Sequence, residues 1–225
     1  MPIPVKNEVV KPRSAKMRIY YTLREWIMYG TLMPGERIND QELSDYFEVS
    51  RTPVREALQI LERQKLIVVY PNKGTVVSEL DTSNLEKWYL PMAHLHALAA
   101  ELACRTITRE QIAELRAIDA QVLQYVMHGD IINTLRQDLF LHNRILAIVD
   151  NEFITEFSET LMLHIQRVEY AFFKKTGLSA ESFCPHDALL DALEQHDAKR
   201  AFDEMLRNWL TILDNTDAAD PRLEG

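Results

Sequence analysis

The chain has 225 residues, enough for one or two domains, and 47% of them are hydrophobic, so it can bury a sizeable core. Its two cysteines lie far apart and match no metal-finger or redox spacing, and the sequence has no glycine-rich phosphate loop and no common hydrolase motif. It also has no apolar signal core and no apolar run of membrane-span length, so we expect a cytoplasmic protein without a membrane partner.

The net charge of −9 is distributed unevenly along the chain. Residues 1–78 contain 12 Lys and Arg against 9 Asp and Glu, whereas residues 79–225 contain 13 against 25. A basic first part joined to an acidic second part suggests a domain that contacts nucleic acid and a domain with another task. For the acidic part, an ordinary solvated surface is the simpler explanation.

The first 13 residues predict a flexible basic arm, because they combine prolines with the scattered positive charges of Lys6, Lys11 and Arg13. Such an arm would add non-specific attraction to phosphates, or be no more than a disordered terminus. The spacing of apolar residues predicts a helix from about Ser14 to Tyr29, and the glycine that follows directly ends it.

Two short helices joined by a three-residue turn are expected next, which is a helix-turn-helix. The first begins at Asn39, where Glu42 completes a candidate capping box. The second covers residues 51–63, with a proline in its first turn. Its apolar stripe consists of Val54, Ala57, Leu58 and Leu61, and a different stripe carries Arg51 and Arg55. Taken alone, this helix could be an ordinary amphipathic helix with solvated arginines.

Two β-branched runs, residues 66–70 and 75–77, flank the turn at residues 71–74 and predict a hairpin. Helix, helix-turn-helix and hairpin in this order describe a winged helix-turn-helix domain, which we place at residues 14–78. In such a domain the N-terminal residues of the second helix of the helix-turn-helix contact base edges. The context therefore favours DNA binding over the ordinary amphipathic helix.

Helical periodicity replaces the strand signals from Leu80 onward. The fold class is therefore mainly α, with the winged domain followed by an antiparallel all-helical bundle at residues 79–215 and a tail at 216–225. Asp130, Asn151, Ser179 and Asp197 are candidate helix caps. We expect six helices in the bundle, at about 82–105, 108–128, 131–149, 151–175, 179–195 and 197–215.

Several polar side chains share the apolar stripes of these helices. Asp138 and His142, four residues apart, lie on one inward side, while His186, Asn208 and His164 lie on the stripes of later helices. A buried carboxylate needs a partner, and bundles build ligand sites from inward side chains on facing helices. These residues therefore predict either a metal or ligand site, or a satisfied Asp–His network in the core.

The first part of the chain resembles the DNA-binding domain of GntR-type bacterial transcription regulators over about residues 14–78. The resemblance rests on residues 30–38 (GTLMPGERI), Leu43, residues 49–58 (VSRTPVREAL), Leu61-Glu62 and Asn72-Lys73-Gly74. It implies that Arg51 and Arg55 reach guanine edges or phosphates and that the wing approaches the minor groove. The DNA-contacting set that it implies is Gln41, Ser50, Arg51, Thr52, Arg55, Lys73 and Gly74, with Gln41 replacing the arginine of several relatives.

The second part resembles the FCD effector domain of FadR-type regulators, in the VanR-like branch with six helices. The resemblance implies one divalent metal of the zinc, nickel or manganese type, held by Asp138, His142 and His186. The fourth ligand position is occupied by Asn208, whose amide oxygen binds such ions more weakly than an imidazole does. His164, on a neighbouring helix, is either a substitute ligand or a core histidine.

The first helix of the bundle has Met92 and His96 where relatives often carry an arginine and a glutamate. Because His94 and His96 are two residues apart, only one of them can face the interior. We expect the effector pocket to include His96, Arg144 and His164, although periodicity does not establish which way the arginine faces.

These features together predict a bacterial transcription regulator and not an enzyme, and the family resemblance implies that it acts as a repressor. It would bind a palindromic double-stranded DNA operator as a homodimer and respond to a small metabolite, an organic acid or a related compound, in the helical domain. A metal-dependent enzyme using Asp138, His142 and His186 is one alternative. A sensor for which the metal ion itself is the signal is the other.

Overall fold

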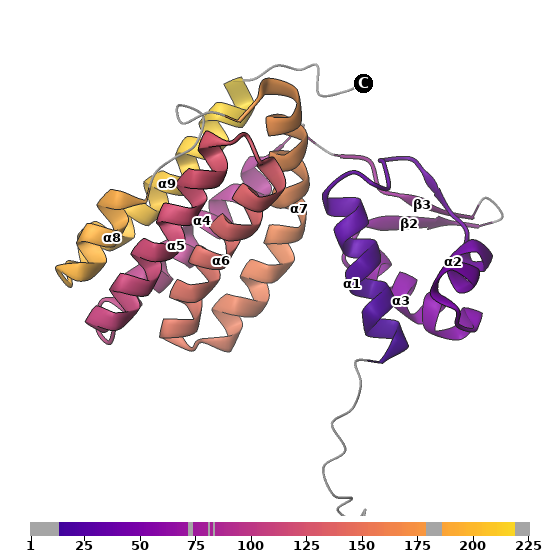
Figure 1. The fold of residues 1–225 in the computed structure, drawn as a ribbon, viewed down its shortest axis with the longest axis horizontal. Helices are drawn as coiled ribbons and strands as arrows, with labels where there is room; N and C mark the ends of the chain where they lie inside the picture. The colour runs from indigo at the N-terminus through magenta and orange to yellow at the C-terminus, as the bar shows by residue number, and fades with distance from the viewer. Residues whose placement is uncertain (1–13, 72–73, 81, 83, 179–185, 219–225) are drawn as a thin grey trace, which may run out of the picture. The chain divides into compact units, whose positions relative to one another are not determined.

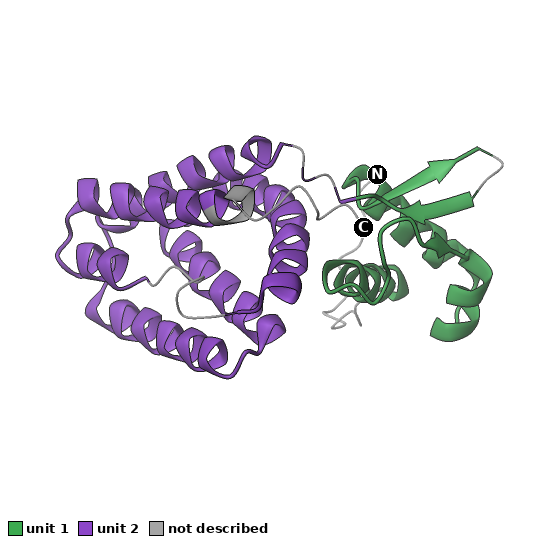
Figure 2. Ribbon diagram, turned by 90° about the horizontal axis from the view of Figure 1, so that it is seen from above, with its two compact units in different colours: residues 1–79 green, residues 80–225 purple. Residues whose placement is uncertain are grey.

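The computed structural model describes residues 14–71, 74–80, 82, 84–178 and 186–218 (Figure 1). The chain divides into two compact units, residues 1–79 and 80–225 (Figure 2). The expected basic arm, Lys73 at the wing tip and the expected cap Ser179 lie outside the described residues. The described part contains no helix that is long and apolar enough to cross a membrane.

Three helices form the body of the first unit: α1 (Ala15–Met28), α2 (Asp40–Phe47) and α3 (Arg51–Arg63). Helix α2 begins where the Asn39 side chain accepts a hydrogen bond from the Gln41 backbone N–H, and it ends at Glu48, whose φ of 54° is left-handed. Glu42 bonds to the Asn39 side-chain amide. The predicted apolar stripe of α3 is confirmed, because Val54, Ala57, Leu58 and Leu61 are buried.

A three-stranded antiparallel sheet completes the first unit, in the order β1-β3-β2. The hairpin consists of β2 (Ile67–Tyr70) and β3 (Gly74–Val77), with Ile67 opposite Val77 and Tyr70 opposite Gly74. Strand β1 (Arg37–Ile38) pairs with the other edge of β3. It was not predicted, because two residues carry no alternation pattern of their own. The winged helix-turn-helix architecture is confirmed.

The second unit consists of helices, as predicted. They are α4 (Glu86–Ala103), α5 (Arg109–Met127), α6 (Ile131–Val149), α7 (Glu152–Thr176), α8 (Asp187–Glu194) and α9 (Ala198–Ala218). Asp130 and Asn151 accept hydrogen bonds from the first-turn N–H groups of α6 and α7, and Thr108 with Gln111 forms a capping box on α5. Three boundaries differ by three residues or more from prediction: α4 begins at Glu86 and not at about 82, α8 begins after His186, and α9 continues three residues beyond 215.

Helix α4 is the central element of the second unit, packed against α6, α7 and α9 (Figure 1). Its buried face includes Ala93, Ala97 and Ala100, whose small side chains allow the neighbouring helices to approach closely. The largest fully buried side chain is Trp209 of α9. Cys104 packs in the same core, as expected of a small apolar group. This packing positions the polar residues of α4, α5, α6 and α8 around one buried point.

Candidate functional site

The N-terminal end of α3 presents polar side chains to solvent. Ser50, Arg51, Thr52 and Arg55 are all exposed, while the opposite side of the helix is buried. Ser50 is the N-cap residue of α3, and its hydroxyl makes no capping hydrogen bond within the described part of the chain. This layout leaves hydroxyl and guanidinium groups available to a ligand at the position where recognition helices contact base edges.

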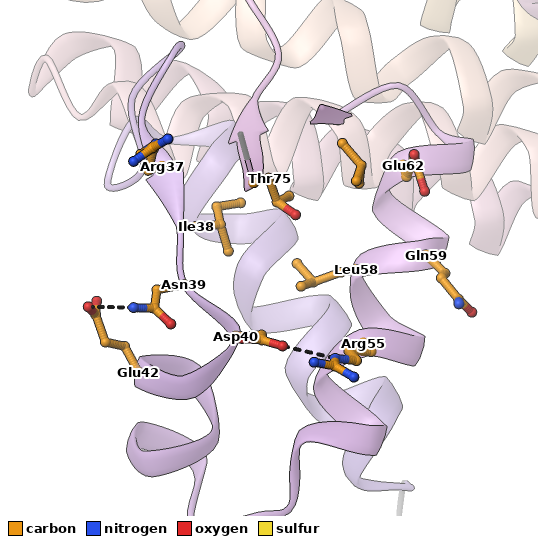
Figure 3. A pocket seen from close by; sticks show the side chains of 12 residues that line it. Arg37, Ile38, Asn39, Asp40, Glu42, Arg55, Leu58, Gln59, Glu62 and Thr75 are labelled. Carbon is orange, nitrogen blue, oxygen red and sulfur yellow. Dashed lines mark hydrogen bonds and ion pairs between the residues drawn. The ribbon is translucent and has the colours of Figure 1, made fainter. Parts of the chain in front are cut away.

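Side chains of α2 hold both arginines. The Gln41 side-chain oxygen accepts hydrogen bonds from Nε of Arg51, at 2.6 Å, and from Nη2 of the same arginine. The Gln41 amide donates to the Asp45 carboxylate at 2.7 Å. Nε of Arg55 lies 2.9 Å from the Asp40 carboxylate (Figure 3). The arginines are therefore oriented by helix α2 before any ligand arrives.

A groove of about 690 Å³ lies between α2, α3 and the wing (Figure 3). Basic Arg37 and Arg55 and acidic Asp40 and Glu62 share its lining with polar and apolar groups. The wing contributes Gly74, which is exposed and has a φ of +93°. A side chain at this position would meet no neighbouring atom but would strain the backbone. The groove therefore has a mixed lining and an accessible wing strand.

The second unit brings together three of the four predicted metal ligands. Nε2 of His186 lies 3.3 Å from the Asp138 carboxylate, and Nε2 of His142 lies 3.8 Å from it. Ligand atoms of these three residues all lie within 4.8 Å of one another. Two ligands bound to one zinc ion at about 2.0–2.1 Å are roughly 3.3 Å apart, which matches the distance from His186 to Asp138, while His142 would have to move closer to share the ion.

Two further residues lie within hydrogen-bonding distance of the Nδ1 atoms of His186 and His142. Nδ1 of His186 lies 2.7 Å from the Asp119 carboxylate, and Nδ1 of His142 lies 3.4 Å from Nδ1 of His96. A proton on Nδ1 of His186 and of His142 would satisfy both hydrogen bonds. In that tautomer each ring keeps a lone pair on Nε2, the atom next to Asp138. The Asp119 carboxylate thus favours the metal-binding tautomer of His186, and the contact with His96 is compatible with the same tautomer of His142.

Burial and neighbouring charges set the protonation states of the cluster. Burial lowers the pKa of His96 to about 3, and burial together with the charges of His96 and His186 lowers the pKa of His142 well below its usual value. Burial and the Asp119 carboxylate raise the pKa of Asp138 to about 6, against the opposing charge of His186. His96 and His142 are therefore neutral at neutral pH, the form in which histidine binds a metal.

The pKa of His186 is shifted in the opposite direction. Burial would lower it, but the hydrogen bond to Asp119 and the charge of Asp138 outweigh burial and raise it. Protonated His186 can bridge the two carboxylates, and a divalent cation would supply the same compensating positive charge. The site chemistry thus fits a metal ion, and it also fits the Asp–His network that was the sequence-based alternative.

Helix α9 closes the cluster with an aromatic side chain. The ring of Trp209 lies 4.9 Å from that of His142 and 5.1 Å from that of His96, centroid to centroid. Asn208, the predicted weak fourth ligand, is buried one residue before it. His94 is exposed and bonds to the backbone of its own helix, so only His96 of that pair faces inward, as expected.

Two residues predicted for the effector pocket lie outside the metal-spaced group. Arg144 is at the surface of α6, where its Nε lies 2.7 Å from the Glu114 carboxylate of α5. This exposed ion pair explains its position, and its assignment to the effector pocket stays a prediction. His164 stacks on Trp88 at 5.1 Å and is not in the metal-spaced group, so it is not a substitute ligand next to His142.

Asp119 and Glu169 are buried acids near the cluster that sequence reasoning missed. Asp119 shares the apolar stripe of Ile112, Leu115 and Val122 on α5, so the rule that selected Asp138 could have found it. Glu169 on α7 is bonded to the Tyr89 hydroxyl at 3.5 Å. Burial and the charge of Asp138 raise its pKa well above the usual value. It shares the buried stripe of Met162, Ile165 and Phe172, so the same rule could have found it.

Both halves of the chain match known families. Residues 15–77 match the profile "Bacterial regulatory proteins, gntR family", and residues 92–209, more than half of the chain, match the FCD domain. The chain belongs to the GntR family. Members of this family are DNA-binding transcription regulators and not enzymes. Its FCD domain, the effector domain of such regulators, contains the histidine cluster.

Curated relatives support the same assignment. This GntR protein is 33% identical over 105 residues to the HTH-type regulator YdhC of Bacillus subtilis (strain 168), covering 47% of each chain. It is 34% identical over 140 residues to the Nta operon transcriptional regulator of Aminobacter aminovorans, covering 61% of this chain and 64% of the relative. The matches to these two relatives therefore span less than two thirds of their lengths.

A longer match extends over most of the molecule. The HTH-type transcriptional repressor RspR of Escherichia coli (strain K12) is 24% identical over 193 residues, which is 86% of this GntR chain and 85% of the relative. Among solved structures, E. coli McbR/YncC superposes with a TM-score of 0.80 at 20% identity, covering 92% of this chain and 99% of that one. At this identity the superposition shows the fold alone.

Proposed function

We propose that this GntR protein is a transcription repressor whose first unit binds an operator and whose helical unit responds to a small molecule. The exposed set Ser50, Arg51, Thr52 and Arg55 at the start of α3 carries the DNA-binding part. Arginine pairs bidentately with guanine, and serine or threonine hydroxyls contact bases or phosphates. Gly74 on the wing and the neighbouring Lys73, which lies outside the described residues, complete the proposed contacts.

The protein would bind DNA as a homodimer, one recognition helix to each half of a palindromic site. A single α3 presents too few base-reading side chains to define a long site, and two-fold symmetry repeats them one helical turn apart. Repression is supported by the name of RspR, a transcriptional repressor that matches 86% of this chain. The small molecule would change operator binding only through different affinities for DNA-bound and free arrangements.

A divalent metal ion of the zinc, nickel or manganese type would be held by Asp138, His142 and His186, with Asn208 as a weak fourth ligand. The hydrogen bond from Nδ1 of His186 to Asp119 supports this assignment, because it leaves the lone pair of Nε2 facing Asp138, and the His96 contact allows the same tautomer of His142. Bound there, the ion would supply a positive charge able to anchor an anionic group such as the carboxylate of an organic acid. In this arrangement His96 would contact Nδ1 of His142 and would not bind the ion itself.

A metal sensor is the second candidate, because the three ligand residues and their two supporting residues form a buried site without any further component. The two candidates differ in what releases DNA. A sensor responds to the metal ion alone, within the physiological range of free metal. An effector-responsive repressor keeps its metal throughout and responds to the added metabolite.

Metal affinity is expected to fall in acid. Below pH 6 a metal ion must displace a proton from Asp138, whose pKa burial and Asp119 raise to about 6. The raised pKa of His186 adds a second proton to displace. We expect the apparent affinity for zinc to fall at least roughly tenfold for each pH unit below 6 and to level off at higher pH. Calorimetric titration at pH 5, 6, 7 and 8 measures this, and equal affinities at pH 5 and 7 would contradict it.

The proposed DNA-binding function is tested by selection from random duplex DNA with the 225-residue chain. The expected product is a palindromic consensus whose half-sites are about 10 base pairs apart, or a multiple of this, centre to centre. Footprinting on genomic DNA then identifies the operators and the neighbouring genes. Enrichment of no sequence over the starting pool would reject the function.

A further inference from the structure

The proposed function assigns the arginines of α3 to DNA, but Gln41 and Asp40 of α2 are the residues that fix their positions. We propose that Gln41 and Asp40 are positioning residues that determine base specificity through Arg51 and Arg55 without contacting bases themselves. This inference rests on the proposed function. It also assigns Gln41 a different role from the direct operator contact that resemblance implied.

The hydrogen-bonding capacity of Gln41 is directed at protein atoms. Its side-chain oxygen accepts two N–H groups of Arg51, and its amide nitrogen donates to Asp45. A glutamine reads adenine by offering both its oxygen and its amide to the base edge. Here both ends are engaged, so readout by Gln41 would require breaking the link between Arg51 and Asp45.

Each arginine is held along one edge only. Arg55 gives Nε to Asp40, and its terminal nitrogens have no hydrogen-bond partner in the described structure. Arg51 gives Nε and one hydrogen of Nη2 to Gln41. Each guanidinium therefore keeps its end, with one hydrogen on each terminal nitrogen, for a guanine O6/N7 edge. Helix α2 holds the arginines without blocking the groups that would read the base.

These contacts contribute little to folding. The side chain of Arg55 is 63% exposed, and solvent-exposed ion pairs add little to stability. The carboxylates of Asp40 and Asp45 also repel DNA phosphates, which weakens binding to every sequence. Because the contacts with α2 order the long arginine side chains before DNA binds, these side chains lose less conformational entropy on binding. The carboxylates therefore lower affinity for all DNA alike, and positioning of the arginines restores affinity only for the correct operator.

A double-mutant cycle tests the role of Gln41. The 225-residue wild type, Gln41→Ala, Arg51→Ala and the double variant are titrated with the selected operator and with its single-base-pair variants, at two salt concentrations. Gln41→Ala is expected to weaken operator binding roughly two- to tenfold. It should also reduce discrimination at the base pairs to which Arg51→Ala is sensitive. The double variant should match Arg51→Ala within about twofold, which is the coupling that positioning requires.

One further variant separates positioning from direct contact. Gln41→Glu made together with Asp45→Asn keeps an acceptor for Arg51 and a hydrogen bond between positions 41 and 45, so this pair of changes should retain base discrimination. A loss from Gln41→Ala that persists in the Arg51→Ala background overturns the inference, as does unchanged discrimination in Gln41→Ala.

Asp40 is tested against a matched carboxylate on the same helical turn. Glu42 is also acidic and in the first turn of α2, but its described contact is with Asn39 and not with an arginine. Asp40→Ala should reduce discrimination at the base pairs to which Arg55→Ala is sensitive. Glu42→Ala should only raise affinity slightly for every sequence. If Asp40→Ala and Glu42→Ala discriminate equally among the base-pair variants of the operator, the proposed role of Asp40 is wrong. If the wild type itself enriches no DNA sequence, the proposed DNA-binding function is rejected, whatever the variants show.

Discussion

Replacing Arg55 by alanine lowers affinity for the selected operator by about ten- to a hundredfold, the loss expected when one bidentate arginine–guanine pair is removed. The variant also leaves Asp40 without its cationic partner at the DNA-binding surface. Because the Arg55 side chain is 63% exposed, folding should be unaffected. Fluorescence anisotropy with the operator and with a random duplex measures both affinities. The thermal unfolding curve provides the check on folding.

Arg63 is the matched control for Arg55. It is exposed in the last turn of the same helix and carries the same charge, but lies far from the N-terminal end that reads bases. Arg63→Ala should weaken binding to operator and random DNA by the same small factor. If Arg55→Ala were to behave like Arg63→Ala, with the two DNAs affected equally, Arg55 would be only a phosphate contact.

Replacing Asp138 by asparagine removes the metal response of the helical unit while keeping the size of the side chain. At a hundredfold excess over the dissociation constant, a metal ion stabilises the wild type by about 2.7 kcal/mol. For a chain of this size, that stabilisation corresponds to a rise of roughly 5–10 °C in the unfolding midpoint. We expect the rise to be nearly absent in Asp138→Asn. In chelator the variant should be as stable as wild type or more so, because Asp138 no longer repels Asp119.

Asp150→Asn is the control for this experiment. Asp150 is exposed at the C-terminal end of α6, with a left-handed φ of 51° that asparagine tolerates well. It should keep the full metal-induced rise. A wild type that shows no rise with zinc, nickel or manganese, and no stoichiometric metal by elemental analysis, would leave the satisfied Asp–His network as the explanation of the cluster.

Local signals in the sequence were sufficient for most helices of both units. Helix α6 matches its predicted bounds of 131–149, because the Asp130 cap marks its start and the Asn151 cap marks the start of the next helix. Helix α8 begins after His186, later than predicted, and residues 179–185 lie outside the described part. Strand β1 could not be anticipated, since it exists only through pairing with β3.

The metal-spaced group was predictable because polar residues on apolar stripes are unusual enough to single out. Asp138, His142 and His186 were selected in this way, and Asp119 satisfies the same rule. Its pairing with His186 could not be read from the sequence, because the two are 67 residues apart and no local pattern links them. The ion pair between Arg144 and Glu114 could not be predicted either, because helical spacing alone does not show which helix an arginine will contact.

The contacts between α2 and α3 were also beyond sequence reasoning. Gln41 and Arg51 are ten residues apart on different helices, and the angle between these helices determines whether they meet. Resemblance placed both among the DNA contacts, whereas the hydrogen bonds suggest that one acts through the other. Base specificity in this protein would then depend on side chains that never touch a base.

The ratio of specific to non-specific affinity, measured at one salt concentration on the 225-residue chain, tests whether this surface reads DNA sequence. We predict that the wild type binds its selected operator at least about a thousandfold more tightly than a random duplex of equal length at physiological salt. The ratio should fall by ten- to a hundredfold in Arg55→Ala. A wild-type ratio within tenfold of unity would contradict sequence-specific DNA recognition by this protein.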